Sequence, residues 1–222
     1  MTNIKTLTIR FANQLERHEI PLFRGAIIAT IGRENDVLLH NHVGAGFRYA
    51  YPEIQYKIID GKAAIVAINN GIKSIAELLS VDEMDIRIGD KNVVLEIEST
   101  DIKRIEMDFI PELKRYTLNL WLPLNQENYK AYTECNDIIE RIEMLQRTLT
   151  GNIISLAKGL DIHLDERIEL KIIDIKEQKP VIFKRQKMMT FNAVFAVNMN
   201  LPIYIGLGKG TSLGFGTINE QS

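Results

Sequence analysis

The sequence EIQYKIIDGKAAIVAIN, residues 53–69, carries the strongest local structural signal in the chain. Two runs rich in β-forming residues, Glu53–Ile59 and Lys62–Asn69, flank the dipeptide Asp60-Gly61. Such a dipeptide is typical of the two-residue turn between antiparallel strands, because both of its residues tolerate positive φ angles. The segment therefore predicts a β-hairpin.

The regions on either side extend this hairpin to a larger unit. Upstream, Thr2–Phe11 alternates polar and apolar residues like a strand, and Ile20–Ile31 has apolar residues at helical spacing, with Pro21 near its start. Downstream, Ile72–Ser80 has helical spacing and Met84–Ile88 returns to strand character. The resulting order, βαββαβ, is that of a ferredoxin-like unit.

The second half begins after a strand region at Val93–Ile110 and a break at Pro111, and it repeats much of this order. We expect a strand at Arg115–Leu122, followed by a helix at Gln126–Lys158. The helix has an apolar stripe (Ile138, Ile142, Leu145, Leu149), a break at Gly151 and a stop at Gly159. Two strands then follow, Ile168–Lys176 and Lys184–Met199, separated by a turn at Gln178–Pro180, and Gly214–Ile218 is a short closing strand. Residues Pro202–Gly216 take the place of a second helix. We therefore predict an α+β fold of two tandem ferredoxin-like, RRM-like units, residues 1–112 and 113–222. In the second unit a glycine-rich loop replaces or follows the second helix.

Composition and length are those of a globular protein. Of the 222 residues, 45% are apolar and 25% are charged. The longest apolar stretches, such as Ala63–Ile68, are far shorter than the roughly 18–20 residues of a membrane helix, and the N-terminus lacks a secretory pattern. Cys135 is the single cysteine, lies in a helical pattern and permits neither an intramolecular disulfide nor a cysteine-based metal site. We expect a cytoplasmic protein without membrane partners.

Charge is unevenly distributed along the chain, although the net charge is only -2. Residues 1–70 carry 8 Lys and Arg against 6 Asp and Glu, and residues 176–222 carry 6 against 2, whereas the middle of the chain is acidic. Such a dipolar molecule is able to hold phosphates on one face. Ordinary scatter of charge is the alternative.

The C-terminal segment Gly206–Gly216, GLGKGTSLGFG, has five glycines in eleven residues. Glycine permits positive φ angles and close approach of a ligand to backbone amides, and Lys209 and Ser212 add a cation and a hydroxyl. A dinucleotide-binding motif would require a helix after the glycines, and a P-loop would require Gly-Lys-Thr or Gly-Lys-Ser; neither occurs. A tight turn network that closes a sheet is the alternative to a ligand-binding loop.

This tail resembles the signature of the CRISPR-associated endoribonucleases of the RAMP superfamily, which cut precursor CRISPR RNA within its repeats. In that signature two glycine-hydrophobic-glycine triplets are separated by about five residues that often include Lys or Arg. Gly206–Gly208 and Gly214–Gly216 are such triplets, and five residues including Lys209 separate them. The family's two ferredoxin-like units are similar to the organisation expected here. The resemblance implies RNA binding by the tail (Gly206, Gly208, Lys209, Ser212, Gly214 and Gly216) and requires no cofactor.

Metal-free RNA cleavage requires one group to deprotonate the 2′-OH and another to protonate the departing 5′-oxygen. Histidine suits both transfers near neutral pH. Of four histidines, only His40 and His42 lie close in sequence, and in extended backbone their side chains share one face. The pair could equally be solvated or packed in a loop, and as zinc ligands it would need further residues, for which Glu34 and Asp36 give no recognised spacing.

The family resemblance implies catalytic roles for this segment, because many members have a catalytic histidine between the first helix and the next strands. His40 and His42 match by place and type, and Tyr49 is the candidate assisting tyrosine. Arg48 is the nearest candidate for stabilising the charged transition state, although Arg24 and Arg33 are equally available.

The densest basic run, Lys184, Arg185 and Lys187, lies at an expected hairpin. It is a candidate for phosphate contacts with a repeat stem, and a solvated strand edge is the alternative. The resulting hypothesis is a metal-independent endoribonuclease whose partner is CRISPR repeat RNA and whose products carry 5′-hydroxyl and 2′,3′-cyclic phosphate ends. A non-catalytic RNA-binding subunit of a CRISPR effector complex is the alternative function. Other effector subunits and a second copy of the chain, forming a homodimer, are the protein partners left open.

Overall fold

The computed structural model describes residues 3–32, 42–43, 46–47, 51–80 and 83–221. The chain forms two compact units. The N-terminal unit comprises Asn3–Glu106 together with Ser212–Gly214, and the C-terminal unit comprises Met107–Thr211 together with residues 215–221. No helix in the described ranges is both long and apolar enough to span a membrane.

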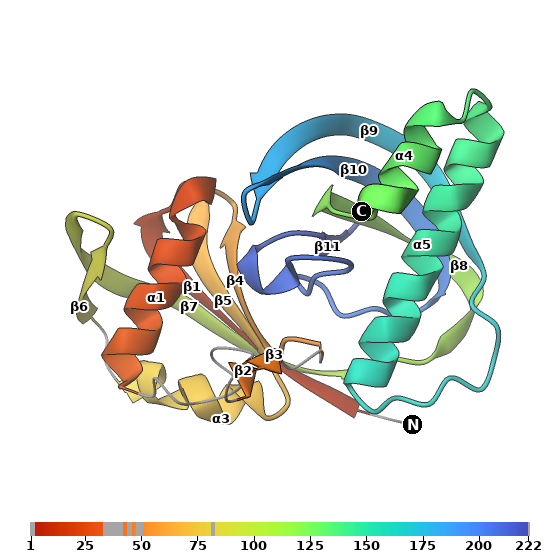
Figure 1. Ribbon diagram of the computed structural model, residues 1–222. Helices are drawn as coiled ribbons and strands as arrows, with labels where there is room; N and C mark the ends of the chain where they lie inside the picture. Colours follow the sequence, from red (N-terminus) through yellow and green to blue (C-terminus); the bar gives the residue numbers. More distant parts are fainter. Residues whose placement is uncertain (1–2, 33–41, 44–45, 48–50, 81–82, 222) are drawn as a thin grey trace. The chain divides into compact units, whose positions relative to one another are not determined.

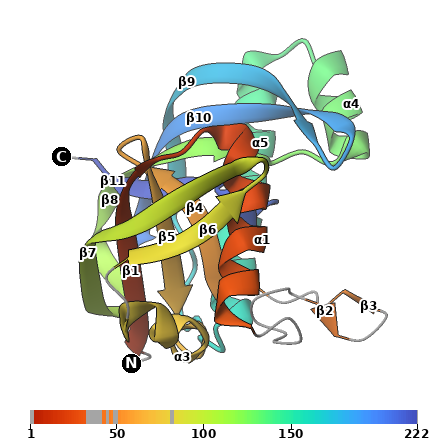
Figure 2. The same cartoon turned by 90° about the vertical axis from the view of Figure 1, so that its left-hand side faces the viewer.

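The N-terminal unit is a five-stranded antiparallel sheet in the order β4-β5-β1-β7-β6, with a helix across one face (Figures 1 and 2). Its elements are β1 (Asn3–Gln14), η1 (Arg17–Glu19), α1 (Ile20–Ile31), β2 (His42–Val43), β3 (Gly46–Phe47), β4 (Ile54–Ile59), β5 (Lys62–Ile68), α3 (Gly71–Ile75), η2 (Ala76–Ser80), β6 (Glu83–Ile88) and β7 (Lys91–Glu106). The predicted helix at Ile20–Ile31 is confirmed at both ends, with Pro21 in its first turn and Gly32 as a left-handed C-cap.

The predicted hairpin is confirmed as β4 and β5. Ile59 pairs with Lys62, so the turn consists of Asp60 and Gly61 with φ angles of 53° and 79°. Tyr56 of β4 reaches the core between sheet and helix, where its ring meets Phe23 of α1 edge-on at 5.9 Å. This hairpin therefore anchors one side of the core.

The fourth strand of the ferredoxin-like order is β7, and the prediction that Met84–Ile88 supplies it is wrong. β7 pairs with β1 from Asn3↔Glu106 to Phe11↔Ile97, whereas β6 pairs only with β7 as an added edge strand. Because β7 is long enough to bond both neighbours, the short strand before it is displaced to the edge. The helix predicted at Ile72–Ser80 is an α-helical turn that continues as a 3₁₀-helix.

The C-terminal unit is a four-stranded antiparallel sheet in the order β11-β8-β10-β9. Its elements are β8 (Phe109–Trp121), α4 (Gln126–Glu134), α5 (Ile138–Gly159), β9 (Leu170–Phe183), β10 (Gln186–Met199), η3 (Thr211–Leu213) and β11 (Thr217–Glu220). In chain order the sheet is 4-1-3-2, the same order as β7-β1-β5-β4 of the N-terminal unit. Both units are ferredoxin-like, and Gly206–Gly216 stands in the chain where the second helix would be.

Two predicted breaks in strands are absent, because proline is tolerated where a strand edge is unpaired. Pro111 lies within β8, ahead of the segment Tyr116–Asn119 that pairs with β11. Pro180 lies within β9, an outer strand of the sheet, and pairs with Met189. The turn predicted at Gln178–Pro180 is therefore wrong, and the hairpin instead turns at Lys184 and Arg185.

The long helix predicted at Gln126–Lys158 is two helices. Cys135 ends α4 in extended conformation, and Asp137 caps α5 by accepting a hydrogen bond from the backbone N–H of Ile139 at 2.7 Å. Gly151 does not break α5, whereas Gly159 does end it. Of the predicted stripe, Leu145 and Leu149 are buried but Ile138, at the start of α5, is 62% exposed. The buried face of α5 continues instead toward its C-terminal end, through Ile153, Leu156 and Ala157.

Candidate nucleic-acid interface

The glycine-rich tail is a compact turn network fixed to the sheet of the C-terminal unit. The backbone N–H of Leu207 donates to the carbonyl of Gly216 at 2.8 Å, and the N–H of Gly216 donates to the carbonyl of Leu120 at 3.1 Å. Gly206 forms a single β-bridge with Thr217, the first residue of β11. The tail thus folds back on itself before the closing strand begins.

Two glycines show why larger residues do not fit. At Gly216, φ is 63° and a Cβ atom would lie 1.9 Å from the carbonyl oxygen of Leu207. At Gly208, φ is 87° and a Cβ atom would lie 3.0 Å from the indole of Trp121. That indole is fully buried, and its Nε1 donates to Asn152 Oδ1 at 2.8 Å. The chain's own packing therefore accounts for both glycines, as expected for a turn network that closes a sheet.

The tail's predicted RNA-binding residues differ in accessibility. Gly206, Gly214 and Gly216 are buried, whereas Lys209 is exposed and Gly208 and Ser212 are half-buried. Ser212–Gly214 packs with the N-terminal unit, where Leu213 lies against the hydrophobic core. The side chains of Lys209 and Ser212 are the tail's accessible polar groups among these six residues.

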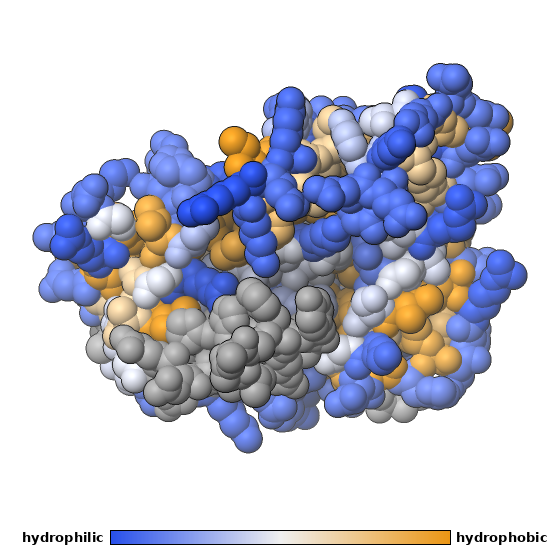
Figure 3. Space-filling view, in the orientation of Figure 1, coloured by the Kyte–Doolittle hydropathy of each residue, from blue (hydrophilic) through white to orange (hydrophobic). Residues whose placement is uncertain are grey.

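The predicted basic run lies at the tip of the β9–β10 hairpin and at the beginning of β10. Phe183 pairs with Gln186 across a two-residue turn, in which Lys184 and Arg185 have φ angles of 48° and 64°. Non-glycine residues in left-handed conformation are uncommon, and here two successive ones project basic side chains from the tip. On the visible face, hydrophilic side chains gather over this hairpin (Figure 3).

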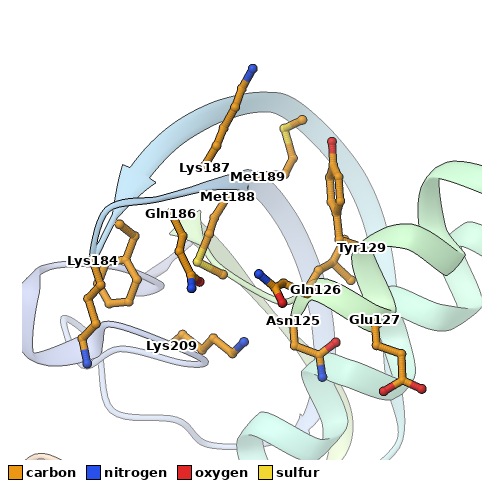
Figure 4. A pocket seen from close by; sticks show the side chains of 12 residues that line it. Asn125, Gln126, Glu127, Tyr129, Lys184, Gln186, Lys187, Met188, Met189 and Lys209 are labelled. Atoms are coloured by element: carbon orange, nitrogen blue, oxygen red, sulfur yellow. The ribbon is translucent and has the colours of Figure 1, made fainter.

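The structure brings this run and the tail together around one hollow of about 540 Å³ in the C-terminal unit. The residues lining it include Lys184, Lys187 and Lys209, and its opposite wall is the start of α4. In Figure 4, Lys209 points into the space beneath the hairpin, whereas Lys187 points away from it. Of the three lysines that line the hollow, Lys184 and Lys209 are therefore the two placed to meet a ligand there.

The wall formed by α4 was not predicted from the sequence. Asn125 caps α4 by accepting a hydrogen bond from the N–H of Asn128 at 2.7 Å, and Gln126 follows at the first helical position. The cap signal is readable from sequence, but it indicates only where a helix begins. The position of Asn125 and Gln126 opposite the β9–β10 hairpin depends on packing between segments about 60 residues apart in the sequence.

Both units of the chain match families of known proteins. Family models described as the Cas6b N-terminal domain and the Cas6b C-terminal domain match residues 2–106 and 108–221. The chain belongs to the Cas6b family. One relative by sequence, the uncharacterized protein MJ0978 of Methanocaldococcus jannaschii, is 34% identical over 106 residues, which are 48% of this chain and 71% of that protein.

Solved Cas6b structures are similar over the whole chain. One crystal structure of Cas6b has a TM-score of 0.88 at 29% identity and covers 99% of this chain and 100% of its own. A second, described as the CRISPR RNA processing endoribonuclease Cas6b, has a TM-score of 0.74 at 26% identity with the same coverage. The likeness therefore extends well beyond the glycine motif.

The candidate catalytic residues of this Cas6b chain lie mostly outside the described residues. His40, Tyr49 and Arg48 fall there, and the backbone of His42 lies in β2, paired with Phe47 of β3. Their catalytic roles stay predictions. Within the described ranges, no cluster of three or more His, Cys, Asp or Glu side chains could hold a metal ion.

A buried cation in the N-terminal unit of this Cas6b chain was also not predicted. Lys57 of β4 is fully buried, and burial lowers its pKa to about 7. A Cβ atom on Gly214 would lie 3.7 Å from Lys57 Cα, so this strand runs directly beside the tail residues that belong to the N-terminal unit. The sequence pattern of β4 did not indicate that Lys57 is buried, because both faces of that strand are buried and no exposed face marks the difference.

Proposed function

We propose that this protein is an endoribonuclease that cuts CRISPR RNA within its repeats without a metal ion. The observation that carries the proposal is the likeness over 99% of the chain to a structure described as a CRISPR RNA processing endoribonuclease, at 26% identity. The doubled glycine-hydrophobic-glycine tail and the lysines beside it support RNA as the ligand.

In the proposed reaction the 2′-oxygen attacks the adjacent phosphorus and the P–O5′ bond breaks. A base removes the 2′-OH proton and an acid protonates the 5′-oxygen, so the products are a 2′,3′-cyclic phosphate and a 5′-hydroxyl. We assign the two proton transfers to His40 and His42, with Tyr49 assisting. No external oxidant, reductant or water is consumed in this step.

RNA binding is assigned to the tail and the β9–β10 hairpin. Lys184, Arg185 and Lys209 supply positive charge, and each lysine or arginine that meets a phosphate releases counterions. The buried glycines maintain the turn network that presents Lys209 and Ser212. Affinity and chemistry thus reside in different segments of the chain.

The test is cleavage of the protein's own repeat RNA by His40→Ala and His42→Ala variants. Each of these substitutions should slow cleavage by roughly 10²- to 10⁴-fold, the usual contribution of a positioned proton transfer. The affinity for RNA should stay near that of wild type. His163→Ala is the matched control, because its side chain is 90% exposed and contacts Asp165. If the double variant binds and cuts like wild type, the histidines are not catalytic. If wild type binds repeat RNA without ever cutting it, the non-catalytic subunit is the correct function.

A further inference from the structure

The hollow beneath the β9–β10 hairpin has walls that phosphate binding alone does not require. Met188 and Phe183 supply apolar atoms, and Gln126 and Gln186 supply amides. Gln186 and Met188 project from the same face of β10 and, in Figure 4, point toward the amide of Gln126 and the side chain of Lys209. Three separate segments of the C-terminal unit therefore direct unlike groups into one space.

The two amides are available to a ligand. Both side chains are exposed, and neither forms a hydrogen bond with any other residue in the described part of the chain. An amide presents a donor and an acceptor side by side, which is the pattern needed to pair with the edge of a nucleobase.

The apolar wall suits a flat ring. The thioether of Met188 is a favourable neighbour for an aromatic face. The ring of Phe183 is held edge-on against Phe215 at 5.1 Å, so its orientation is fixed before any ligand binds. Aromatic side chains bind bases by stacking with little dependence on base type.

The charge at the hollow suits a phosphate next to that ring. Lys184 and Lys209 lie on its margin. Partial desolvation lowers the pKa of the Lys209 side chain, so an anion placed beside its ammonium would offset the lost hydration. The volume of about 540 Å³ lies within the range of roughly 300–1,000 Å³ typical of small-molecule sites.

We propose that this hollow binds one unpaired nucleotide of the RNA, with its base between Met188 and the amides of Gln126 and Gln186 and its phosphate near Lys184 and Lys209. The inference rests on the proposed function and adds a specificity site to it. A paired base cannot enter, because its edge is already hydrogen-bonded and its faces are stacked, whereas an unpaired base is free to be splayed out.

The experiment is an abasic scan of the protein's own repeat RNA combined with a double-mutant cycle. Each nucleotide in turn is replaced by an abasic one, and the Kd is measured for wild type and for the Gln126→Ala/Gln186→Ala variant. In wild type, replacing one unpaired nucleotide should lower the affinity by roughly 5- to 160-fold, the range of base-stacking contributions. In the variant, the same abasic change should cost less than in wild type, because the amide hydrogen bonds to the base are already absent and only stacking on Met188 is left to lose.

Gln14→Ala is the matched control, since Gln14 is an exposed glutamine at the end of β1. It should reproduce the wild-type scan. If no single position couples to the double variant while wild type binds and cuts the RNA, the nucleotide site is refuted and the proposed function stands. If wild type does not bind its repeat RNA at all, both fail.

Discussion

Gly216 provides a sharp test of the structural role assigned to the tail. In Gly216→Ala the new Cβ would lie 1.9 Å from a backbone oxygen at a φ of 63°, so both the conformation and the space are unsuitable. The left-handed conformation costs roughly 1–2 kcal/mol. Displacing the backbone costs roughly 1–3 kcal/mol more as overpacking, and weakens two hydrogen bonds worth about 1 kcal/mol each. We expect a total loss of about 4 kcal/mol.

Trp121 makes this loss measurable in the relevant unit. It is the single tryptophan, it is buried, and it lies beneath Gly208 of the tail, so its fluorescence during urea unfolding reports on the C-terminal unit. A loss of about 4 kcal/mol corresponds to a midpoint shift of roughly 2 M urea at a typical slope of about 2 kcal/mol/M.

Gly151→Ala is the matched control for that measurement. Gly151 lies in α5 of the same unit with nothing within 4 Å of its would-be Cβ. Alanine there should stabilise by about 0.5–1 kcal/mol, because glycine is unfavourable inside a helix. A Gly216→Ala midpoint within about 0.5 M of wild type would refute the turn network described here.

Three further outcomes follow from buried and charged groups. The pKa of Lys57 falls from 10.5 in the unfolded chain to about 7 in the folded protein. Between these pH values the unfolded chain therefore carries a proton on Lys57 that the folded protein lacks. The free energy of unfolding of wild type should thus rise by up to about 1.4 kcal/mol per pH unit as pH increases through this window. In Lys57→Met this slope should be absent and stability at pH 7 higher; equal slopes in urea titrations from pH 7 to 10 would contradict the assignment. Asn152→Ala removes the acceptor of the buried indole N–H and should lower the C-terminal unit's urea midpoint by the equivalent of about 1–3 kcal/mol. Lys184→Ala/Lys209→Ala should reduce the slope of log Kd against log salt by about two, one for each phosphate contact, whereas exposed Lys176→Ala should not change it.

Local chemistry in the sequence predicted much of the N-terminal unit. The Asp60-Gly61 turn and the helix at Ile20–Ile31 were found correctly because the signals lie within a few residues of one another. The order of strands in the sheet could not be predicted in this way, because it depends on which distant strand each one pairs with. Met84–Ile88 had good alternation and still became an added edge strand, because Lys91–Glu106 took the position beside β1.

Proline and glycine misled the prediction where tertiary context decided their effect. Pro180 looked like a turn, but an outer strand accommodates a residue without an N–H. Gly151 looked like a break, but α5 continues through it, since packing of Leu149 and Ile153 on either side stabilises the helix.

The candidate site was predictable only in part. The spacing of the glycines identified the tail, and the basic run identified the hairpin. The hollow was invisible in the sequence because Gln126, Gln186 and Lys209 come from three segments that only the fold brings together. The catalytic assignment to His40 and His42 remains a prediction from sequence.

Metal-independent cleavage by 2′-OH attack can be measured by incubating wild-type protein with its own repeat RNA in EDTA and mapping both ends of every fragment. We expect one cut per repeat at the same rate as without EDTA, with a 5′-hydroxyl on one fragment and a 2′,3′-cyclic phosphate on the other. Cleavage that stops in EDTA and returns with added magnesium or zinc, or that leaves a 5′-phosphate and a 3′-hydroxyl, would contradict it.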